Sequence, residues 1–546
     1  MSLKINSDLF QFLSQESPKE LKRLIGFSAL LGVTNTVLVA VINAAAKQVS
    51  ESGSVTWQFF LYALLLFFFL IIAKFSNSEN IQNSRDIIYR FRIRIMRDVF
   101  HSNLAKIDEI GRHYIIEVMA RDTQMVAQSI VIVVTAFQSI ATLIFMTLYL
   151  ATVSITAFAI IAVASVLIIL VGVRKLSNVT QRLDGMAKDE MQVNALYSDF
   201  LNGYKEIKMN SRRAYEMTSD LMQQTKSVNE ETTRVITALT NFFNYLQVVL
   251  YVVVGIIIFV VPVFSSGFSS SVMTATTTAL FLAGSLTGII MSIPHISQAD
   301  VAAKSLRNLA SNLEQASEPE FSDPPGRFDQ VGQIALKEVV FSHSKIETAG
   351  RFTLGPINYT FERGGVYFIR GNNGSGKTTL MRILIGLIQP QSGQIFVDGA
   401  PLSLPASSQY RDLFAVVFSD FFLFKKLYGL SVSAPEETDR LLKLFKMSDK
   451  VKISEGEFSD IHLSTGQRKR LALIVALLEK RQFLVLDEWA ADQDPEFRRE
   501  FYHEIIPAIR AMGKTVIAIT HDDQYYEVAD HVLRMSDGKL VQSELS

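Results

Sequence analysis

Long apolar runs dominate the first 300 residues of the chain. A helix needs roughly 20 mostly apolar residues to cross the hydrocarbon core of a bilayer. Six runs meet that criterion: Ile25–Ala45, Val55–Phe75, Val126–Leu150, Val153–Val173, Tyr245–Phe264 and Val272–Ile293. The third and fourth runs meet at Ala151–Thr152 without a strong turn signal. One continuous helix there would be wholly apolar and roughly 70 Å long, so we predict two spans joined by a tight hairpin.

The distribution of positive charge predicts how the spans are oriented. The stretches between spans two and three and between spans four and five are rich in Lys and Arg, whereas the opposite side carries only Lys47. Because Lys and Arg are enriched in cytoplasmic loops, we place both stretches and both termini in the cytoplasm. Few Gly or Pro interrupt these stretches, so we expect them to continue as helices that turn near Gly111 and Asn202–Tyr204.

Polar residues are few within the spans, and charged residues are nearly absent. The polar positions are Asn35, Asn43, Gln138, Gln247 and Thr274–Thr278. Because ion-coupled transport usually needs charged side chains inside the membrane, this class of transport is disfavoured. The polar residues have two interpretations, a substrate cavity or hydrogen bonds between helices, and the second is the commoner role.

The pattern changes after the sixth span. It stays helical through about Glu314, and then Glu318-Pro319 and Asp323–Gly326 interrupt it, because Pro cannot continue a helix. We therefore predict a linker at 316–330 between an all-α membrane domain, residues 1–315, and a second domain, residues 331–546. The second domain alternates short β-rich runs with amphipathic stretches, as α/β domains do.

Composition excludes several classes of function. The formal net charge of the 546 residues is zero, and without a basic excess we do not expect nucleic acid as a partner. The chain has no cysteine. Disulfides, thiolate zinc sites, iron–sulfur clusters and cysteine-protease chemistry are therefore all excluded.

A phosphate-binding loop follows the β-rich run Val366–Arg370. The loop consists of Gly371, Asn372, Asn373, Gly374, Ser375, Gly376, Lys377 and Thr378, with Thr379 directly after it. A Gly-x-x-x-x-Gly-Lys-Thr loop exposes backbone N–H groups to phosphate oxygens, and the helix that follows directs its positive end at them. We expect Lys377 to reach the β- and γ-phosphates of a nucleotide and the Thr378 hydroxyl to bind Mg²⁺.

Two acidic residues end a second buried run. Phe483–Leu486 is apolar enough for a central strand, and Asp487 and Glu488 follow it. An acid at this point can hold the Mg²⁺ of a phosphate-binding loop, which fits Asp487. Glu488 is then the candidate general base for the attacking water, a role that contributes roughly 10²–10⁴-fold to a rate. The alternative interpretation is an ordinary surface pair of acids.

A histidine ends a third such run. His521 follows the β-rich run Thr515–Ile519 and precedes two aspartates. A histidine at this position can contact the γ-phosphate and hold the water that Glu488 activates. The alternative is a loop histidine without a catalytic role.

A second helix start has the composition of an anion site. Leu463, Ser464, Thr465, Gly466 and Gln467 precede the basic, apolar helix predicted over Arg468–Leu478. The N–H groups at a helix start attract phosphate, although Ser-Thr-Gly is often only a helix cap. A second phosphate-binding turn in one domain makes sense if it serves ATP held by the loop of a partner chain.

In this order the motifs resemble those of the ATP-binding cassette (ABC) family. Walker A corresponds to 371–378, the signature to 463–467, Walker B to 483–487, and the switch histidine to His521. The apolar half resembles the six-span domain that exporters of this family carry N-terminal to the cassette. More narrowly, Asp487–Pro495, Gly203–Lys208 and Phe414–Phe424 resemble segments of bacterial exporters of cyclic peptides and siderophore-peptide precursors.

The resemblance implies a multi-domain membrane protein, with an all-α six-helix transmembrane exporter domain fused to an α/β P-loop ATP-binding cassette. It implies ATP and Mg²⁺ as cofactors, a homodimer with two shared ATP sites, and a multi-pass location in the bacterial inner membrane among membrane lipids. Periplasmic or outer-membrane export partners are compatible with it. A peptide-like cargo is the narrow expectation. The alternatives are a lipid or multidrug exporter and a membrane-bound regulatory ATPase that moves no substrate.

The chain departs from the family pattern at four positions. Ser419, beside Asp420, replaces the usual glutamine of the Q-loop, which puts its contact to Mg²⁺ in question. His343 replaces the aromatic residue that stacks on adenine, Thr465 replaces a signature glycine, and Trp489 replaces a small residue. The resemblance also assigns Asp494 to the loop at the cassette interface. The base, the lysine and the switch histidine are all retained, so we expect active hydrolysis.

Overall fold

The computed structural model describes residues 7–16, 18–52, 57–260, 272–315, 330–342, 352–402, 408–430 and 435–542. The chain forms two compact units, one made of residues up to 100 together with 110–315, the other of 101–109 together with the residues from 316 onward. The predicted linker lies almost wholly outside the described residues, as does His343.

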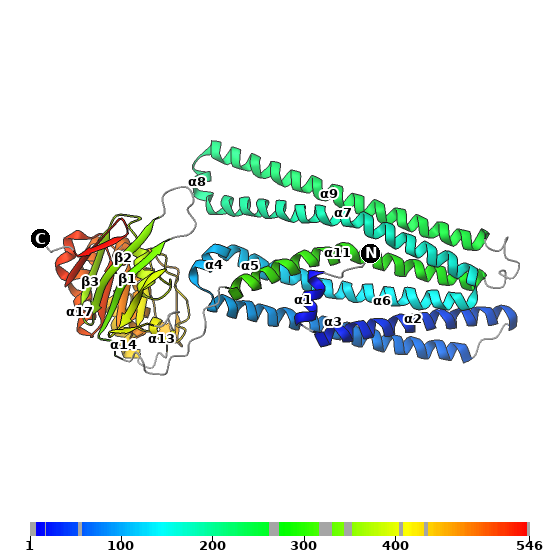
Figure 1. Cartoon of the computed structure of the whole chain (residues 1–546), viewed down its shortest axis with the longest axis horizontal. Helices are drawn as coiled ribbons and strands as arrows, with labels where there is room; N and C mark the ends of the chain where they lie inside the picture. Colours follow the sequence, from blue (N-terminus) through cyan, green and yellow to red (C-terminus); the bar gives the residue numbers. More distant parts are fainter. Residues whose placement is uncertain are drawn as a thin grey trace. The chain divides into compact units, whose positions relative to one another are not determined.

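The first unit is helical, and its long helices run alongside one another (Figure 1). The described helices of residues 7–315 are α1 (Asp8–Glu16), α2 (Pro18–Ser52), α3 (Trp57–His101), α4 (Leu104–Ile110), α5 (Arg112–Glu117), η1 (Val118–Asp122), α6 (Thr123–Val153), α7 (Ile155–Asn202), α8 (Tyr204–Lys208), α9 (Ser211–Gly255), η2 (Ile256–Val260) and α11 (Val272–Gln315). Most of α4 belongs to the second unit. Helix α6 packs against α2 and α11, and α7 packs against α9.

Apolar helices occur at all six predicted spans. Five described helices are long and apolar enough to cross a membrane: Pro18–Val49, Trp57–His101, Arg112–Val153, Ser211–Gly255 and Met273–Gln315. A shorter apolar helix, Ile155–Val171, begins α7. Helix α3 leaves large apolar side chains such as Phe60 exposed, which suits a surface that faces lipid.

The predicted hairpin between the third and fourth spans is confirmed, with its break two residues later. Ser154 separates α6 from α7 and has an extended backbone, with φ −156° and ψ 117°. Its side chain accepts a hydrogen bond from the N–H of Ala157 at 3.4 Å. This hydroxyl therefore caps the start of α7, a role that serine commonly has.

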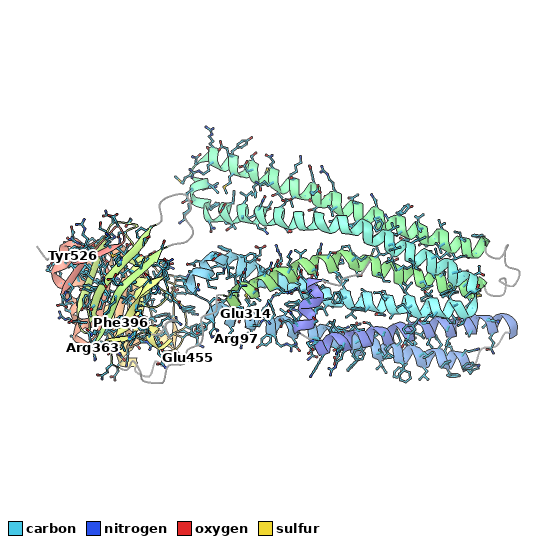
Figure 2. The ribbon with its side chains drawn as sticks, in the orientation of Figure 1. Arg97, Glu314, Arg363, Phe396, Glu455 and Tyr526 are labelled. Atoms are coloured by element: carbon cyan, nitrogen blue, oxygen red, sulfur yellow. The ribbon has the colours of Figure 1, made fainter. Side chains whose placement is uncertain are left out.

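The helices are interrupted at both predicted turning points. Gly111 separates α4 from α5 with φ 89°, a conformation that glycine adopts without strain. Gly203 separates α7 from α8, and two residues, Met209 and Asn210, separate α8 from α9. Figure 2 shows Arg97 of α3 and Glu314 of α11 at the same end of the helical unit. The predicted cytoplasmic ends of these two helices thus lie at the same end of the helical unit.

Small and polar residues join the helices within the spans. A Cβ on Gly32 of α2 would come within 2.6 Å of the Cβ of Ala141 in α6, and one on Gly288 of α11 within 2.6 Å of Ser139 Oγ. Such glycines let helix backbones approach closely in membranes. The buried Asn43 donates to Thr278 Oγ1 at 3.4 Å, from α2 to α11. For this pair the interpretation as a bond between helices is therefore supported.

The second unit is an α/β domain with two main sheets. A six-stranded sheet has the order β12-β11-β3-β10-β9-β6, a four-stranded sheet has the order β2-β1-β4-β5, and β7 pairs with β8. The strands are β1 (Gln333–Ser342), β2 (Thr353–Glu362), β3 (Val366–Gly371), β4 (Ser392–Val397), β5 (Ala400–Pro401), β6 (Phe414–Val417), β7 (Ile453–Ser454), β8 (Glu457–Phe458), β9 (Phe483–Asp487), β10 (Thr515–Ile519), β11 (His531–Ser536) and β12 (Lys539–Gln542).

Helices and short turns cover the sheets (Figure 1). They are α12 (Lys377–Leu384), α13 (Ser408–Arg411), α14 (Pro435–Leu444), α15 (Thr465–Leu478), η4 (Trp489–Asp492), α16 (Pro495–Glu500), η5 (Phe501–Ile505), α17 (Ile506–Ala511) and η6 (Asp523–Val528). Strands β9 and β10 are buried along their whole length, as the apolar runs before Asp487 and His521 predict.

The sheet register brings three chain segments to one edge. Strands β3, β9 and β10 are parallel, and Ile519 pairs with both Ile369 and Asp487. The carboxyl ends of the three strands therefore coincide, which is where open α/β sheets bind ligands. The loop after β3, the acids after β9 and the histidine after β10 all begin at this edge.

Candidate active site

The loop after β3 depends on its glycines. Gly374 and Gly376 have φ of 79° and 101°, values that residues with a Cβ rarely adopt. A Cβ on Gly371 would also come within 2.3 Å of the carbonyl oxygen of Met535, and one on Gly376 within 2.8 Å of Leu354 Cδ1. Asn372, Gly374 and their neighbour Asn373 are exposed. The backbone is thus bent into a loop whose outer face is accessible to phosphate.

Lys377 lies across this loop. Its Nζ donates to the carbonyl oxygens of Gly371 and Asn372, at 2.8 and 3.2 Å, and the residue is buried. The carbonyls hold the ammonium group close to the loop, where phosphate oxygens would accept charge-assisted hydrogen bonds. Thr378 and Thr379 follow in the first turn of α12 and are half-buried.

Asp487 has the surroundings of a cation ligand. It is 1% exposed, its Oδ2 accepts from Ser419 Oγ at 3.0 Å, and its buried Oδ1 has no hydrogen-bond partner among the described residues. The pKa of Asp487 is raised above its ordinary value, mainly because burial disfavours the charged carboxylate. The hydrogen bond from Ser419 offsets part of this rise. An unpaired carboxylate oxygen suits a hard cation such as Mg²⁺. Ser419, the predicted departure in the Q-loop, therefore directly contacts the predicted metal ligand, and Asp420 is the exposed residue after it.

Glu488 and His521 lie side by side. The Nε2 of His521 is 3.4 Å from Glu488 Oε1, and both side chains are partly exposed. Glu488 has a left-handed backbone with φ 49°, a conformation that costs about 1–3 kcal/mol and is concentrated at functional sites. Its N–H donates to the carbonyl of Ile519 at 3.0 Å, which joins the ends of β9 and β10. Two groups that accept or donate protons therefore lie in direct contact at this edge of the sheet, where both can contact the same polar molecule, such as water.

The turn Leu463–Gln467, called here the signature turn, forms a helix cap. Ser464 Oγ accepts from the N–H of Gln467, and Gln467 Oε1 accepts from the N–H of Ser464, both at 3.3 Å. The capping interpretation is therefore correct locally. Outside α15, Gly466 contacts Asp492 and Gln493 among the described residues. None of those contacts joins this turn to the phosphate-binding loop.

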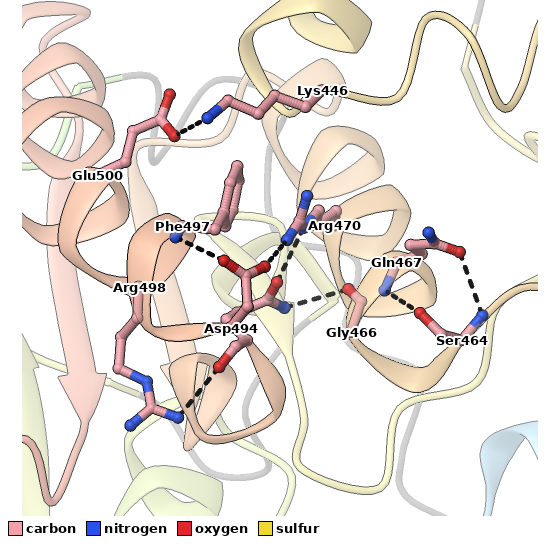
Figure 3. Close-up of polar contacts among 10 residues, drawn as sticks. Lys446, Ser464, Gly466, Gln467, Arg470, Asp494, Phe497, Arg498 and Glu500 are labelled. Atoms are coloured by element: carbon pink, nitrogen blue, oxygen red, sulfur yellow. Dashed lines mark hydrogen bonds and ion pairs between the residues drawn. The ribbon is translucent and has the colours of Figure 1, made fainter.

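Two basic residues that the sequence prediction did not include, Lys469 and Arg470, hold the segment after Glu488, which contains the predicted Asp494 (Figure 3 shows Arg470 and Asp494). Asp494 accepts from the N–H of Phe497 at 2.8 Å and from Arg470 at 2.7 Å. The Phe497 N–H and the Arg470 guanidinium lower the pKa of Asp494. Lys469 Nζ donates to the carbonyl of Glu488 at 2.9 Å. The sequence shows a basic run at Arg468–Arg470, but not what it contacts.

Trp489 is part of the cassette core. It is 2% exposed, its ring centroid is 4.3 Å from that of Phe501, and its Nε1 donates to the carbonyl of Lys469 at 2.9 Å. This large residue thus fixes the backbone directly after Glu488 to the core and to α15.

We expect Trp489→Phe to lower the free energy of unfolding of the cassette by about 1–2 kcal/mol, because it removes buried volume and a hydrogen bond. Thermal unfolding of the purified full chain measures this. Trp57→Phe is the matched control, because Trp57 is 62% exposed. Equal unfolding temperatures for the two variants would contradict the packing role of Trp489.

Comparisons with known proteins agree with this architecture. The sequence profile of the ABC transporter family matches residues 354–491. The chain is 32% identical over 535 residues to the ATP-binding protein SyrD of Pseudomonas syringae pv. syringae. This alignment covers 94% of the chain and 93% of SyrD. The chain is 30% identical to the energy-coupling factor transporter ATP-binding protein EcfA1 of Thermotoga maritima over 214 residues, covering 38% of this chain and 80% of the relative.

A solved structure has the same fold. The structure of a bacterial Atm1-family ABC exporter with ATP bound matches with a TM-score of 0.77 and 16% identity, over 95% of both chains. The predicted fold class and family resemblance are thus confirmed. The chain belongs to the ABC transporter family, as a multi-pass membrane protein in which an exporter-type helical domain is fused to an ATP-binding cassette that couples ATP hydrolysis to transport.

Proposed function

We propose that the chain exports a peptide-like substrate, a cyclic peptide or a nonribosomal siderophore-type peptide, across the bacterial inner membrane. The observation that carries this proposal is the segment Asp487–Pro495, which resembles exporters of such peptides and in which the unusual Trp489 is built into the core. Both termini lie in the cytoplasm in this proposal, on the side of the Lys- and Arg-rich helices.

The functional unit we propose is a homodimer. One chain carries one phosphate-binding loop and one signature turn, and the described contacts of that turn run to the segment after Glu488. Each ATP would therefore lie between the loop of one chain and the signature turn of its partner. ATP binding closes the two cassettes and turns the cavity outward, and hydrolysis resets them.

Hydrolysis in this proposal uses the groups at the carboxyl edge of the sheet. Lys377 and the loop N–H groups bind the phosphates, and His521 holds the attacking water beside Glu488, which accepts its proton. Thr378 and Asp487 would hold Mg²⁺, and the unpaired Asp487 Oδ1 fits that assignment. When bound, Mg²⁺ neutralises charge that develops on the phosphate oxygens.

The experiment that tests the cargo is an ATPase assay in proteoliposomes, with cyclic peptides, siderophore precursors, lipids and lipophilic drugs added separately. We expect one peptide class to stimulate phosphate release selectively, and Glu488→Gln gives the background rate. Stimulation by lipids or drugs alone would favour the alternative exporter. Activity that no compound changes would favour a regulatory ATPase.

A further inference from the structure

Gln493 uses both ends of its side-chain amide. It is 4% exposed and lies in the interface loop, defined here as residues 490–494. Its Nε2 donates to the carbonyl of Gly466 in the signature turn at 3.1 Å, and its Oε1 accepts from Arg470 Nε at 2.8 Å. The amide thus joins the interface loop to the first turns of α15.

Helix α15 holds the rest of this loop with two cations (Figure 3 shows the Arg470 contacts). Arg470 donates to Asp494 at 2.7 Å, and its guanidinium lies 3.5 Å from the centre of the Phe497 ring. Lys469, which is 3% exposed, contacts Asp492 Oδ2 at 2.7 Å and donates to the Glu488 carbonyl at 2.9 Å. The same helix therefore contacts the loop and the backbone of the candidate base.

On its other side the loop is connected to the histidine segment. Arg498 donates to the carbonyls of Ala491 and Gln493, at 3.0 and 3.1 Å. It also contacts Asp522, the residue after His521, at 3.4 Å. Asp522 in turn accepts from Tyr502 at 2.9 Å. The interface loop is thus bonded both to α15 and to the segment that carries His521.

The packing between the loop and the signature turn leaves little room. A Cβ on Gly466 would come within 2.6 Å of the carbonyl oxygen of Asp492. A shift of the signature turn therefore either moves the interface loop or breaks the hydrogen bond between the Gly466 carbonyl and Gln493. Burial makes that break costly, because an unpaired buried polar group loses hydrogen bonds to water without replacing them.

We propose that Gln493 is a positioning residue that fixes the signature turn relative to Glu488. In the proposed homodimer the signature turn faces the ATP of the partner chain, whereas Glu488 acts on the ATP of its own chain. Gln493 therefore connects the two ATP sites. This inference rests on the proposed homodimer. A leucine at this position would have similar volume, but it would leave the Gly466 carbonyl and Arg470 Nε without this partner.

The test compares Gln493→Leu with Gln493→Glu. The carboxylate still accepts from Arg470 but no longer donates to Gly466, so the two variants share only the loss of that bond. We expect both to lower kcat for ATP hydrolysis about tenfold, the effect of a small misplacement of catalytic groups. Affinity for ATP at the phosphate-binding loop should stay within about twofold, because that loop does not contact Gln493 among the described residues.

A second readout isolates positioning from stability. In the Glu488→Gln background, retention of radiolabelled ATP after washing reports nucleotide enclosed by both chains, and adding Gln493→Leu should reduce it severalfold. Gln482→Leu is the matched control, because it removes an amide that accepts from the Val331 N–H at 2.9 Å, next to the opposite end of β9.

The outcomes separate the two proposals. Wild-type kcat in either Gln493 variant, or unchanged ATP retention, overturns the inference while the proposed function stands. The same losses in Gln482→Leu also overturn it, because they would then reflect stability alone. If Glu488→Gln itself retains no ATP, the proposed homodimer fails and the inference fails with it.

Discussion

Replacing Glu488 by Gln is expected to reduce ATP turnover by about 10²–10⁴-fold while leaving ATP bound. The amide has nearly the same shape as the carboxylate but cannot accept the proton of the attacking water. The backbone contacts of this residue, to Ile519 and from Lys469, do not involve the replaced atom. The variant should therefore keep the geometry of the site and accumulate as a closed, ATP-bound dimer. Phosphate release and retained nucleotide measure the two effects.

The matched control is Glu527→Gln, which removes an exposed carboxylate from η6. Its turnover should equal that of the wild type. Near-normal turnover in Glu488→Gln would show that another group is the base.

Replacing Lys377 by Ala is expected to weaken ATP binding about ten- to hundredfold. The change removes a donor that would form charge-assisted hydrogen bonds to phosphate, each contributing about 1.5–3 kcal/mol. It also removes the ammonium group that bonds the carbonyls of Gly371 and Asn372, so the loop loses an internal contact. Binding of a fluorescent ATP analogue to the purified chain measures the loss.

Lys443→Ala serves as its control, because Lys443 is an exposed residue of α14. Unchanged nucleotide affinity in Lys377→Ala would contradict the assignment of the phosphate-binding loop. The two main variants also differ from each other in a useful way. Glu488→Gln separates binding from hydrolysis, whereas Lys377→Ala removes binding and hydrolysis together.

Local patterns were sufficient to predict the parts of the site that depend on a single segment. The glycine spacing of 371–378 predicts a bent loop because residues with a Cβ rarely adopt the backbone angles of Gly374 and Gly376. The apolar runs before Asp487 and His521 predict buried strands, and in the structure these strands are parallel and their carboxyl ends meet at one edge. The spans follow from hydropathy alone. The predicted boundary between the third and fourth spans, at Ala151–Thr152, lies within three residues of the observed helix break at Ser154.

The contacts that link the segments could not be predicted, because each joins residues far apart in sequence. Gln493 bonds to Gly466, 27 residues away, and Ser419 bonds to Asp487, 68 residues away. The sequence identifies Ser419 only as a departure that puts the Mg²⁺ contact of the Q-loop in question, whereas the structure gives it a direct hydrogen bond to the predicted ligand Asp487. Trp489 was likewise identified only as unusual, since its partner Phe501 contacts it through the tertiary fold.

The most direct test of the central claim is transport itself. Inside-out vesicles that contain the wild-type chain, with cassettes facing the medium, would be given ATP, Mg²⁺ and a radiolabelled cyclic peptide. We predict that the peptide accumulates in the lumen with ATP, and that vesicles with Glu488→Gln show no accumulation above background. ATP hydrolysis by the wild type without accumulation of any peptide, drug or lipid would contradict the account of the chain as an exporter.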